Sequence, residues 1–330
     1  MKPFTNVNAR NVEEAVRLLG DRRRASQSVS LAGGGSDLLG MIKDDLVAPD
    51  VLVNLKSIDG HRAVTPHADG ALIGGLITLN RLAEHPRVRA DYTALAEAAG
   101  SVGTPQIRNV GTLAGNICQR PWCWYLRAGF PCFKNGGDMC FSWIGENQFN
   151  AIFGGGPSYI VHPSDTAPAL VALDARFHIT GPTGKRVVLA SEFFSLPRID
   201  VSRENVLHPD EVLTEVEIPA SPLGTKSRYA KVLDREAWTH AVVSAAVVLR
   251  MEGEVCRGAR VVLGGVAPIP WRLPEVEAML RGQSITEGLA ARAGREAVAG
   301  AEPLSKNAYK IPLTENLVRR TLLELTGSLS

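Results

Sequence analysis

The most informative stretch of this sequence is GTPQIRNVGTLAGNICQ, at residues 103–119. Its glycines, Gly103, Gly111 and Gly115, alternate with short hydrogen-bonding side chains. These side chains are Thr104, Gln106, Arg108, Asn109, Thr112 and Asn116. Glycine lets the backbone approach a ligand closely, and the polar groups can bond to it. The stretch therefore predicts a loop that holds a large polar ligand with a diphosphate and a heterocycle.

A second glycine-rich turn precedes it, in LAGGGSDLLG at residues 31–40. An apolar strand is expected at Val29–Ala32 and a short helix near 36–43, so the glycines lie between strand and helix. Backbone N–H groups in such a turn favour a phosphate, and Ser36 or Asp37 is a candidate helix cap. The segment lacks the third glycine of a G-x-G-x-x-G motif and the lysine of a Walker loop. Taken alone, it is equally typical of an ordinary tight turn.

A third polar segment is HPSD, at residues 162–165. Ser164 or Asp165 can bond to hydroxyl groups of the same ligand, or cap a helix that begins near Thr166. For Asp165 a plain helix cap is the competing interpretation, and both roles can hold at once. His162 is the best titratable candidate beside the ligand, although a structural role is favoured for it.

Composition narrows the class of protein. The 330 residues predict two or three domains, and 45% hydrophobic with 21% charged residues is ordinary for a globular chain. A net charge of +2 without a block of like charge excludes a nucleic-acid or polybasic membrane footprint. No apolar run approaches the roughly 20 residues of a membrane span. The N-terminus lacks the apolar core of a signal peptide and begins instead with a helix near 11–20, capped by Asn11, so export would require a signal on a partner.

The pattern along the chain indicates three units. Residues 1–55 are βαβ-like, and 56–220 form a second subdomain that contains an almost helix-free stretch at 103–165. After a Pro- and Gly-containing junction at 218–227, residues 221–330 form an α+β domain with a packing and partner-binding role.

Within the second unit we expect a strand, turn and helix at 71–89, a helix at 90–102, and a helix then a strand at 167–182. In the third we expect strands at Tyr229–Val232, His240–Met251 and Ala259–Val266, and helices at 273–282, 284–299 and 314–327.

Three further segments complete a family resemblance that covers almost the whole chain. They are EVLTEVEIP (211–219), RYAKVLDREAWTHAVVSAA (228–246) and VVLGGVAPIPWRL (261–273). Together with the glycine turns and HPSD, they resemble the flavoprotein subunits of the xanthine dehydrogenase and carbon monoxide dehydrogenase family. The resemblance implies an α+β fold: a two-subdomain, PCMH-type FAD-binding domain, followed by a C-terminal α+β domain like that of the carbon monoxide dehydrogenase flavoprotein.

The resemblance also implies which residues bind FAD. The first turn would wrap the pyrophosphate, while Val102 and 112–116 would line the isoalloxazine and phosphate side. Asp165 would bond the ribityl or ribose region, and Leu213 and Lys231 would flank the flavin. For Lys231, a surface ion pair with Asp234 is the competing interpretation. The full set is Leu31, Ala32, Gly33, Gly34, Gly35, Ser36, Asp37, Leu38, Val102, Gly103, Gln106, Ile107, Gly111, Thr112, Gly115, Asn116, Ser164, Asp165, Leu213 and Lys231.

Four of the five cysteines, Cys118, Cys123, Cys132 and Cys140, lie within a short insertion at 117–160, with 4, 8 and 7 residues between them. Thiolates on irregular loops are typical of iron–sulfur clusters. Four unrelated buried thiols are the competing interpretation, and Cys256 is assigned no function. The chain resembles the flavoprotein subunits that carry such an insertion, which include those of periplasmic-type aldehyde oxidoreductase and 4-hydroxybenzoyl-CoA reductase. The resemblance implies a [4Fe–4S] cluster, and three ligands in these subunits match Cys123, Cys132 and Cys140. Their fourth ligand follows a Gly-Gly-Gly-Pro run, where this chain has Ser158, so Ser158, Cys118, a three-iron form or no cluster are all open.

The function implied is that of an electron-transfer subunit of a heterotrimeric molybdenum hydroxylase. A large subunit with the molybdenum cofactor would oxidise the organic substrate, and a small subunit with [2Fe–2S] clusters would pass the electrons to FAD and then to an external acceptor. No acid–base pair or nucleophile is expected on this chain. The expected location is cytoplasmic, or periplasmic through a partner's twin-arginine signal.

Two alternative functions are also considered. A stand-alone PCMH-type flavin oxidase often attaches FAD to a histidine near the first turn, and 31–38 contains none. A non-enzymatic redox sensor or scaffold would hold no flavin.

The insertion is also rich in aromatic side chains, which either shield a cluster, form a satellite core or contact a partner. They are Trp122, Trp124, Tyr125, Phe130, Phe133, Phe141 and Trp143.

Overall fold

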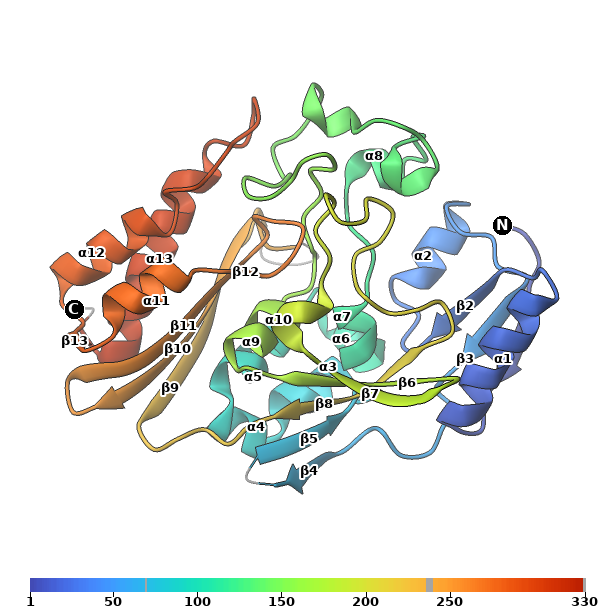
Figure 1. Cartoon of the computed structure of the whole chain (residues 1–330), viewed down its shortest axis with the longest axis horizontal. Helices are drawn as coiled ribbons and strands as arrows, with labels where there is room; N and C mark the ends of the chain where they lie inside the picture. The colour runs from blue at the N-terminus through green and yellow to red at the C-terminus, as the bar shows by residue number, and fades with distance from the viewer. Residues whose placement is uncertain (69, 236–239, 329–330) are drawn as a thin grey trace.

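The computed structural model of the chain describes residues 1–68, 70–235 and 240–328. Its first unit is a small parallel sheet of order β1-β3-β2 with a helix on one face (Figure 1). Asn11 caps that helix as expected, because its side-chain oxygen accepts the Glu14 N–H at 2.8 Å. The buried apolar positions Ala15, Val16 and Leu19 then face the sheet. The elements are β1 (Thr5–Asn8), α1 (Val12–Arg24), β2 (Val29–Ala32), α2 (Leu38–Lys43) and β3 (Val51–Asn54).

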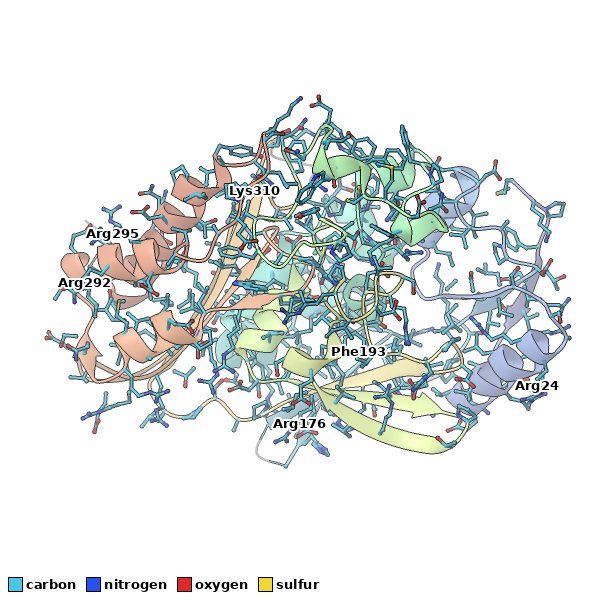
Figure 2. All side chains as sticks on the ribbon, turned by 45° about the horizontal axis from the view of Figure 1, so that its top comes forward. Arg24, Arg176, Phe193, Arg292, Arg295 and Lys310 are labelled. Atoms are coloured by element: carbon cyan, nitrogen blue, oxygen red, sulfur yellow. The ribbon has the colours of Figure 1, made fainter. Side chains whose placement is uncertain are left out.

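The second unit is an antiparallel sheet of order β4-β5-β8-β6-β7, packed against short helices. Its central strand, β8, comes from far along the chain, so the sheet closes only after the cysteine-rich insertion. Phe177 and Phe193 are fully buried between sheet and helices, and Figure 2 shows Phe193 in the interior. The strands are β4 (Val64–His67), β5 (Gly70–Gly74), β6 (Arg176–Gly181), β7 (Gly184–Leu189) and β8 (Val212–Ile218). The helices are α3 (Leu79–Glu84), α4 (Pro86–Asp91), α5 (Thr93–Gly100), α6 (Pro105–Val110), α7 (Leu113–Ile117), α9 (Thr166–Ala172) and α10 (Ala190–Phe193).

The stretch 103–165 is only partly the loop that was expected. The glycine-rich segment folds into two short helices, α6 and α7, so the prediction is wrong there. Thr104 and Thr112 cap them by accepting the N–H groups of Ile107 and Gly115, which compensates for poor intrinsic helix propensity. The remainder, from Cys118 to Asp165, holds a single turn of helix, α8 (Trp124–Arg127), and two 3₁₀ turns, η1 (Phe133–Asn135) and η2 (Phe141–Trp143). In Figure 1 it lies across the top of the molecule, between the first and third units.

The third unit is an antiparallel sheet of order β12-β11-β10-β9, with β13 paired to β11. Helices α11, α12 and α13 cover its outer face, while α5 and α9 of the second unit pack against the other (Figure 1). The α+β fold that the sequence implies is therefore confirmed. The elements are β9 (Thr225–Val232), β10 (Val243–Glu252), β11 (Val255–Gly264), β12 (Trp271–Arg272), α11 (Pro274–Leu280), β13 (Gln283–Ser284), α12 (Glu287–Glu296) and α13 (Lys310–Thr326). Part of the quoted segment 228–246, residues 236–239, lies outside the described residues.

Among the described residues, no helix has the length and apolar character needed to span a bilayer.

Candidate functional site

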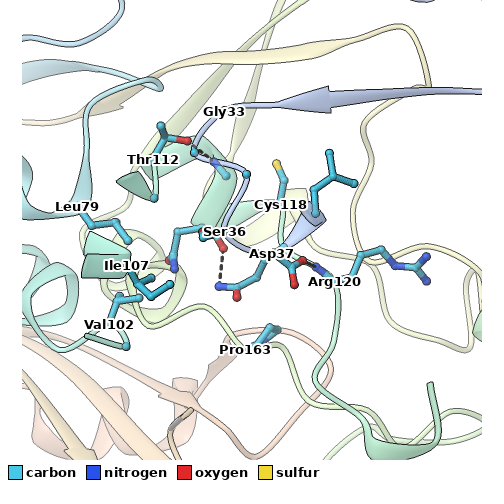
Figure 3. Close-up of a pocket in the computed structure, with 18 of the residues that line it drawn as sticks. Gly33, Ser36, Asp37, Leu79, Val102, Ile107, Thr112, Cys118, Arg120 and Pro163 are labelled. Atoms are coloured by element: carbon cyan, nitrogen blue, oxygen red, sulfur yellow. Dashed lines mark hydrogen bonds between the residues drawn. The ribbon is translucent and has the colours of Figure 1, made fainter. Parts of the chain in front are cut away.

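A cavity of about 520 Å³ lies where the two glycine-rich segments meet (Figure 3). Most of the residues proposed as FAD ligands line it. They are Leu31, Ala32, Gly33, Gly34, Gly35, Ser36, Asp37, Leu38, Val102, Gly103, Ile107, Gly111, Thr112, Gly115, Asn116 and Asp165. Leu213 lines a smaller neighbouring cavity of about 140 Å³, which shares Gly33 and Thr112 with the first. The structure thus brings together segments far apart in the sequence, whereas Gln106, Ser164 and Lys231 are not among the lining residues.

Close contact between the two segments explains the glycines of the first turn. A Cβ atom at Gly34 would lie 2.1 Å from the Val110 carbonyl oxygen, and one at Gly33 would lie 2.6 Å from Thr112 Oγ1. Gly35 adopts a φ of +74°, which favours glycine. The glycines are therefore required by packing of loop on loop, and this packing forms one edge of the cavity.

The first turn also offers hydrogen-bond donors. Within the part of the chain that the structure describes, the backbone N–H groups of Gly34, Gly35 and Ser36 donate to no protein acceptor. Gly34 and Gly35 are half-buried, so their N–H groups need an acceptor, and a run of such groups beside a cavity suits the oxygens of a diphosphate. The residues present therefore fit the pyrophosphate of FAD.

The expected cap at Ser36 or Asp37 is wrong, because the helix that follows has no side-chain cap. Asp37 instead faces the insertion: Oδ2 accepts the Arg120 backbone N–H at 3.0 Å, and Oδ1 lies 2.8 Å from the Arg127 guanidinium. Figure 3 places Asp37 beside Arg120 at the edge of the cavity.

In the HPSD segment, the helix cap comes from Ser164 and not from Asp165. Ser164 provides the cap of α9, since its Oγ accepts the Ala167 N–H at 3.1 Å, whereas Asp165 makes no cap bond. Ser164 and Thr166 also donate to Asn116 Oδ1, at 2.6 and 2.7 Å. These bonds fix the second glycine-rich segment to α9, so Ser164 positions the cavity wall rather than lining it.

Asp165 is the acceptor of a buried cluster. Its Oδ2 lies 2.7 Å from Lys231 Nζ, and its Oδ1 accepts the Tyr229 hydroxyl at 2.6 Å. The Lys231 and Asp165 side chains are each only 4% exposed. The surface ion pair with Asp234 is therefore wrong, and the charge of Lys231 is balanced by Asp165. Burial, together with the negative Asp165, holds the pKa of Tyr229 well above its usual range, so the phenol remains a donor.

His162 lies inside the second unit, away from the cavity lining. Its ring meets Phe194 edge-on at 4.7 Å, and its Nδ1 accepts the Ser164 N–H at 3.3 Å. Burial lowers the pKa of His162 to about 3, so the imidazole is neutral at physiological pH.

Sequence reasoning missed one wall of the cavity, which the start of the insertion supplies. Arg120 and Trp122 line it, together with Pro163, Arg235 and His240. The Trp122 ring lies 5.2 Å from the His240 ring and 4.6 Å below the Arg127 guanidinium. In the sequence, only their position could have indicated this role, because Arg120 and Trp122 directly follow the second glycine-rich segment.

Among the four cysteines of the insertion, Cys118 lies apart from Cys123, Cys132 and Cys140. Cys118 lines the larger cavity, and burial raises the pKa of its thiol to about 12. The pKa of Cys123 is raised by burial and, to a smaller extent, by the neighbouring Cys140 and Cys132. Cys140 Sγ accepts the Tyr159 N–H at 3.5 Å, which places the sulfur next to Ser158. Among the described residues, no three His, Cys, Asp or Glu side chains are arranged to hold a single metal ion.

Three aromatic residues of the insertion contact one another. Tyr125, Phe130 and Phe141 have ring centroid distances of 5.1–5.9 Å, and Phe130 is exposed, so they form a partly exposed cluster rather than a buried core. Trp122, Trp124 and Trp143 remain largely exposed.

Comparison with known proteins agrees with this architecture over the whole chain. Residues 2–221 match the family model of the FAD binding domain in molybdopterin dehydrogenase, and 228–325 match that of the carbon monoxide dehydrogenase flavoprotein C-terminal domain. The chain is 32% identical to the aldehyde oxidoreductase FAD-binding subunit PaoB of Escherichia coli, covering 98% of both chains. It is 30% identical to the carbon monoxide dehydrogenase medium chain of Hydrogenophaga pseudoflava, over 95% of this chain and 93% of that one. A solved structure of carbon monoxide dehydrogenase from the same organism matches with a TM-score of 0.78 and 26% identity, over 100% of both chains.

Proposed function

The chain belongs to the family of FAD-binding flavoprotein subunits of molybdenum hydroxylases, and on this premise we propose that it binds FAD non-covalently in the cavity between its two glycine-rich segments and relays electrons. The observation that carries the proposal is the run of backbone N–H groups at Gly34, Gly35 and Ser36, which have no acceptor among the described residues. They lie beside a cavity that three separate segments wall.

When bound, FAD supplies the chemistry, which is the uptake of an electron pair and its release to an acceptor. The residues of this chain bind and orient the cofactor. The first turn would donate to the pyrophosphate, and Val102 and Ile107 would pack against the ring system. Asp165 would accept hydroxyl groups of the sugar-alcohol chain, held in place by Tyr229 and Lys231. No proton transfer to an organic substrate is assigned to this chain.

The partners in this proposal are a large subunit with the molybdenum cofactor and a small subunit with [2Fe–2S] clusters. The large subunit would oxidise the organic substrate, and the small one would deliver electrons to this chain. An external acceptor then removes them. The medium chains to which this chain is similar, such as that of carbon monoxide dehydrogenase, support this assignment. A cytoplasmic place, or a periplasmic one reached through a partner's twin-arginine signal, belongs to the same proposal.

A [4Fe–4S] cluster on Cys123, Cys132 and Cys140 is the finer part of the proposal. The position of Cys123 supports it, since Cys140 and Cys132 lie close enough to add to the rise that burial causes in its pKa. For the fourth position we favour Ser158 over Cys118. Ser158 is 4% exposed and precedes Tyr159, whose N–H meets Cys140 Sγ, whereas Cys118 lines the cavity proposed for FAD. An alkoxide oxygen is a poorer partner for iron than a thiolate, so such a cluster would be labile.

The test is a visible spectrum with iron and acid-labile sulfide analysis on the anaerobically purified chain, alone and with its partner subunits. Flavin absorption that is released by acid precipitation supports non-covalent FAD. Covalently retained flavin would favour a stand-alone oxidase, and no flavin at all would favour a sensor or scaffold.

The same preparations test the cluster. About four irons and four sulfides per chain support it. Cys123→Ser would then lose the iron, whereas Cys118→Ser would keep it if Ser158 is the fourth ligand. Ser158→Cys would slow the loss of iron in ferricyanide. Wild-type protein with flavin but without iron would overturn the cluster and leave the FAD proposal intact.

A further inference from the structure

We infer that Arg127, a residue of the cysteine-rich insertion, is a positioning residue for FAD because it neutralises Asp37 in the wall of the diphosphate cavity. This inference rests on the proposed binding of FAD in that cavity. It makes the insertion part of the cofactor site, independently of whether the insertion carries a cluster.

The starting observation is a carboxylate in the wrong place for an anionic ligand. Asp37 lines the cavity directly after the three glycines and Ser36, whose N–H groups suit a diphosphate. Its side chain is only 18% exposed, so water screens the charge poorly. An unpaired carboxylate there would repel the pyrophosphate of FAD.

Two other cations near the wall, Arg120 and Lys231, are engaged elsewhere. The Arg120 side chain pairs with Glu204 at 3.3 Å, and Glu204 is also paired with Lys134 at 2.9 Å. Lys231 pairs with Asp165. Of the ion pairs found among the described residues, Arg127 makes the one at Asp37, with Nη2 2.8 Å from Oδ1.

The same guanidinium also shapes the wall. Its Nε donates to the Pro121 carbonyl and its Nη2 to the Arg120 carbonyl, both at 2.9 Å. Its plane lies over Trp122, which lines the cavity beside His240. With only 11% of its side chain exposed, Arg127 is held in one geometry by these contacts. One residue therefore cancels the charge of Asp37 and docks residues 120–122 onto the first glycine turn.

The experiment measures the dissociation constant of FAD for the full-length chain after removal of flavin, in titrations followed by flavin fluorescence. Arg127→Met should weaken FAD binding by on the order of tenfold, the effect expected from loss of a charge-assisted hydrogen bond at a half-buried carboxylate. Raising the salt concentration should reduce that deficit only slightly, because the Asp37 carboxylate is largely buried and salt screens buried charges poorly. Asp37→Asn alone should bind FAD at least as tightly as the wild type.

The double variant separates charge from packing. If Arg127 acts by neutralising Asp37, then Asp37→Asn together with Arg127→Met should bind FAD more tightly than Arg127→Met alone. If Arg127 only held the loop in place, the double variant would be as weak as Arg127→Met or weaker. Arg176→Met is the matched control, since Arg176 makes an ion pair of the same 2.8 Å length with Glu217, on a surface strand. It should leave FAD affinity unchanged.

Unaltered FAD affinity in Arg127→Met, weakened binding in Asp37→Asn, or absence of rescue in the double variant would each overturn the inference. A wild-type chain that does not take up FAD would instead overturn the proposed function, so the two failures are distinct.

Discussion

Lys231 Nζ lies 2.7 Å from Asp165 Oδ2, and both side chains of this salt bridge are almost entirely shielded from water. The pair joins β9 of the third unit to the segment before α9 of the second, and Lys231 also donates to the Ser101 carbonyl at 3.1 Å. A cation that the sequence suggested as a flavin contact is thus a cross-link between units, and we expect it to affect FAD only through Asp165.

Lys231→Met should destabilise the chain strongly, by about 3–5 kcal/mol, because it leaves Asp165 charged and buried without its counter-ion. Asp165→Asn combined with Lys231→Met should cost less than Lys231→Met alone, since no uncompensated charge remains. Urea unfolding of the flavin-free chain measures both. Equal losses in the single and double variants would show that the charge of Asp165 is balanced by other groups.

Gly34→Ala should prevent flavin binding and lower stability by about 1–3 kcal/mol, as expected for overpacking at a rigid contact. The added methyl group would meet the Val110 carbonyl oxygen and push the two glycine-rich segments apart. Gly40, in α2 close by, has no atom within 4 Å of its Cβ position. Gly40→Ala should therefore keep the flavin and gain about 0.5–1 kcal/mol from helix propensity. Flavin content after purification and thermal unfolding of both variants check the prediction.

His162 should make the fold acid-sensitive. The pKa of the folded-state imidazole is about 3, against 6.5 when exposed, so the unfolded chain binds the additional proton between these values. Stability from this group is complete above pH 6.5 and falls as the pH is lowered toward 3, by up to about 1.4 kcal/mol per pH unit. His162→Gln should show a shallower loss between pH 6 and 4 in urea unfolding. Parallel curves for wild type and variant would contradict the assignment.

Lys310→Met should cost about 2 kcal/mol or more in urea unfolding, because it leaves buried carbonyl oxygens without a donor. Lys310 Nζ donates to Phe149, Asn150 and Gly265 carbonyls at 2.7–3.1 Å, and its side chain is fully buried at the start of α13 (Figure 2). Lys226 also donates to a backbone carbonyl, that of Leu325, but at an exposed site. Lys226→Met should therefore change stability by less than about 0.5 kcal/mol.

The sequence predicted the parts of the site that depend on local chemistry. Gly33, Gly34 and Gly35 stood out because a side chain there would meet close neighbours or a strained backbone. Asn11 stood out because a side-chain cap acts within one turn. These features need only a few neighbouring residues, so a linear pattern reveals them.

Pairings between residues far apart in the chain could not be predicted from the sequence. Nothing in the sequence around Asp37 indicates that its partner is Arg127, or that Ser164 rather than Asp165 caps α9. Such choices are decided by which side chains arrive at the same place once the sheets have formed. The two short helices α6 and α7 were missed for a related reason, since threonine caps and packing stabilise sequences with weak helix propensity.

The wall of the cavity is contributed by residues 30–38, 102–122 and 163–165, and finally by His240 near the start of β10. During synthesis, the ribosome must therefore have released most of the chain before the last of these pieces is available. A polypeptide that ends before His240 has the glycine turns but lacks this part of the wall. If FAD occupies the cavity as proposed, retained flavin would therefore report that this late part of the chain has folded onto the site, before any partner subunit is met.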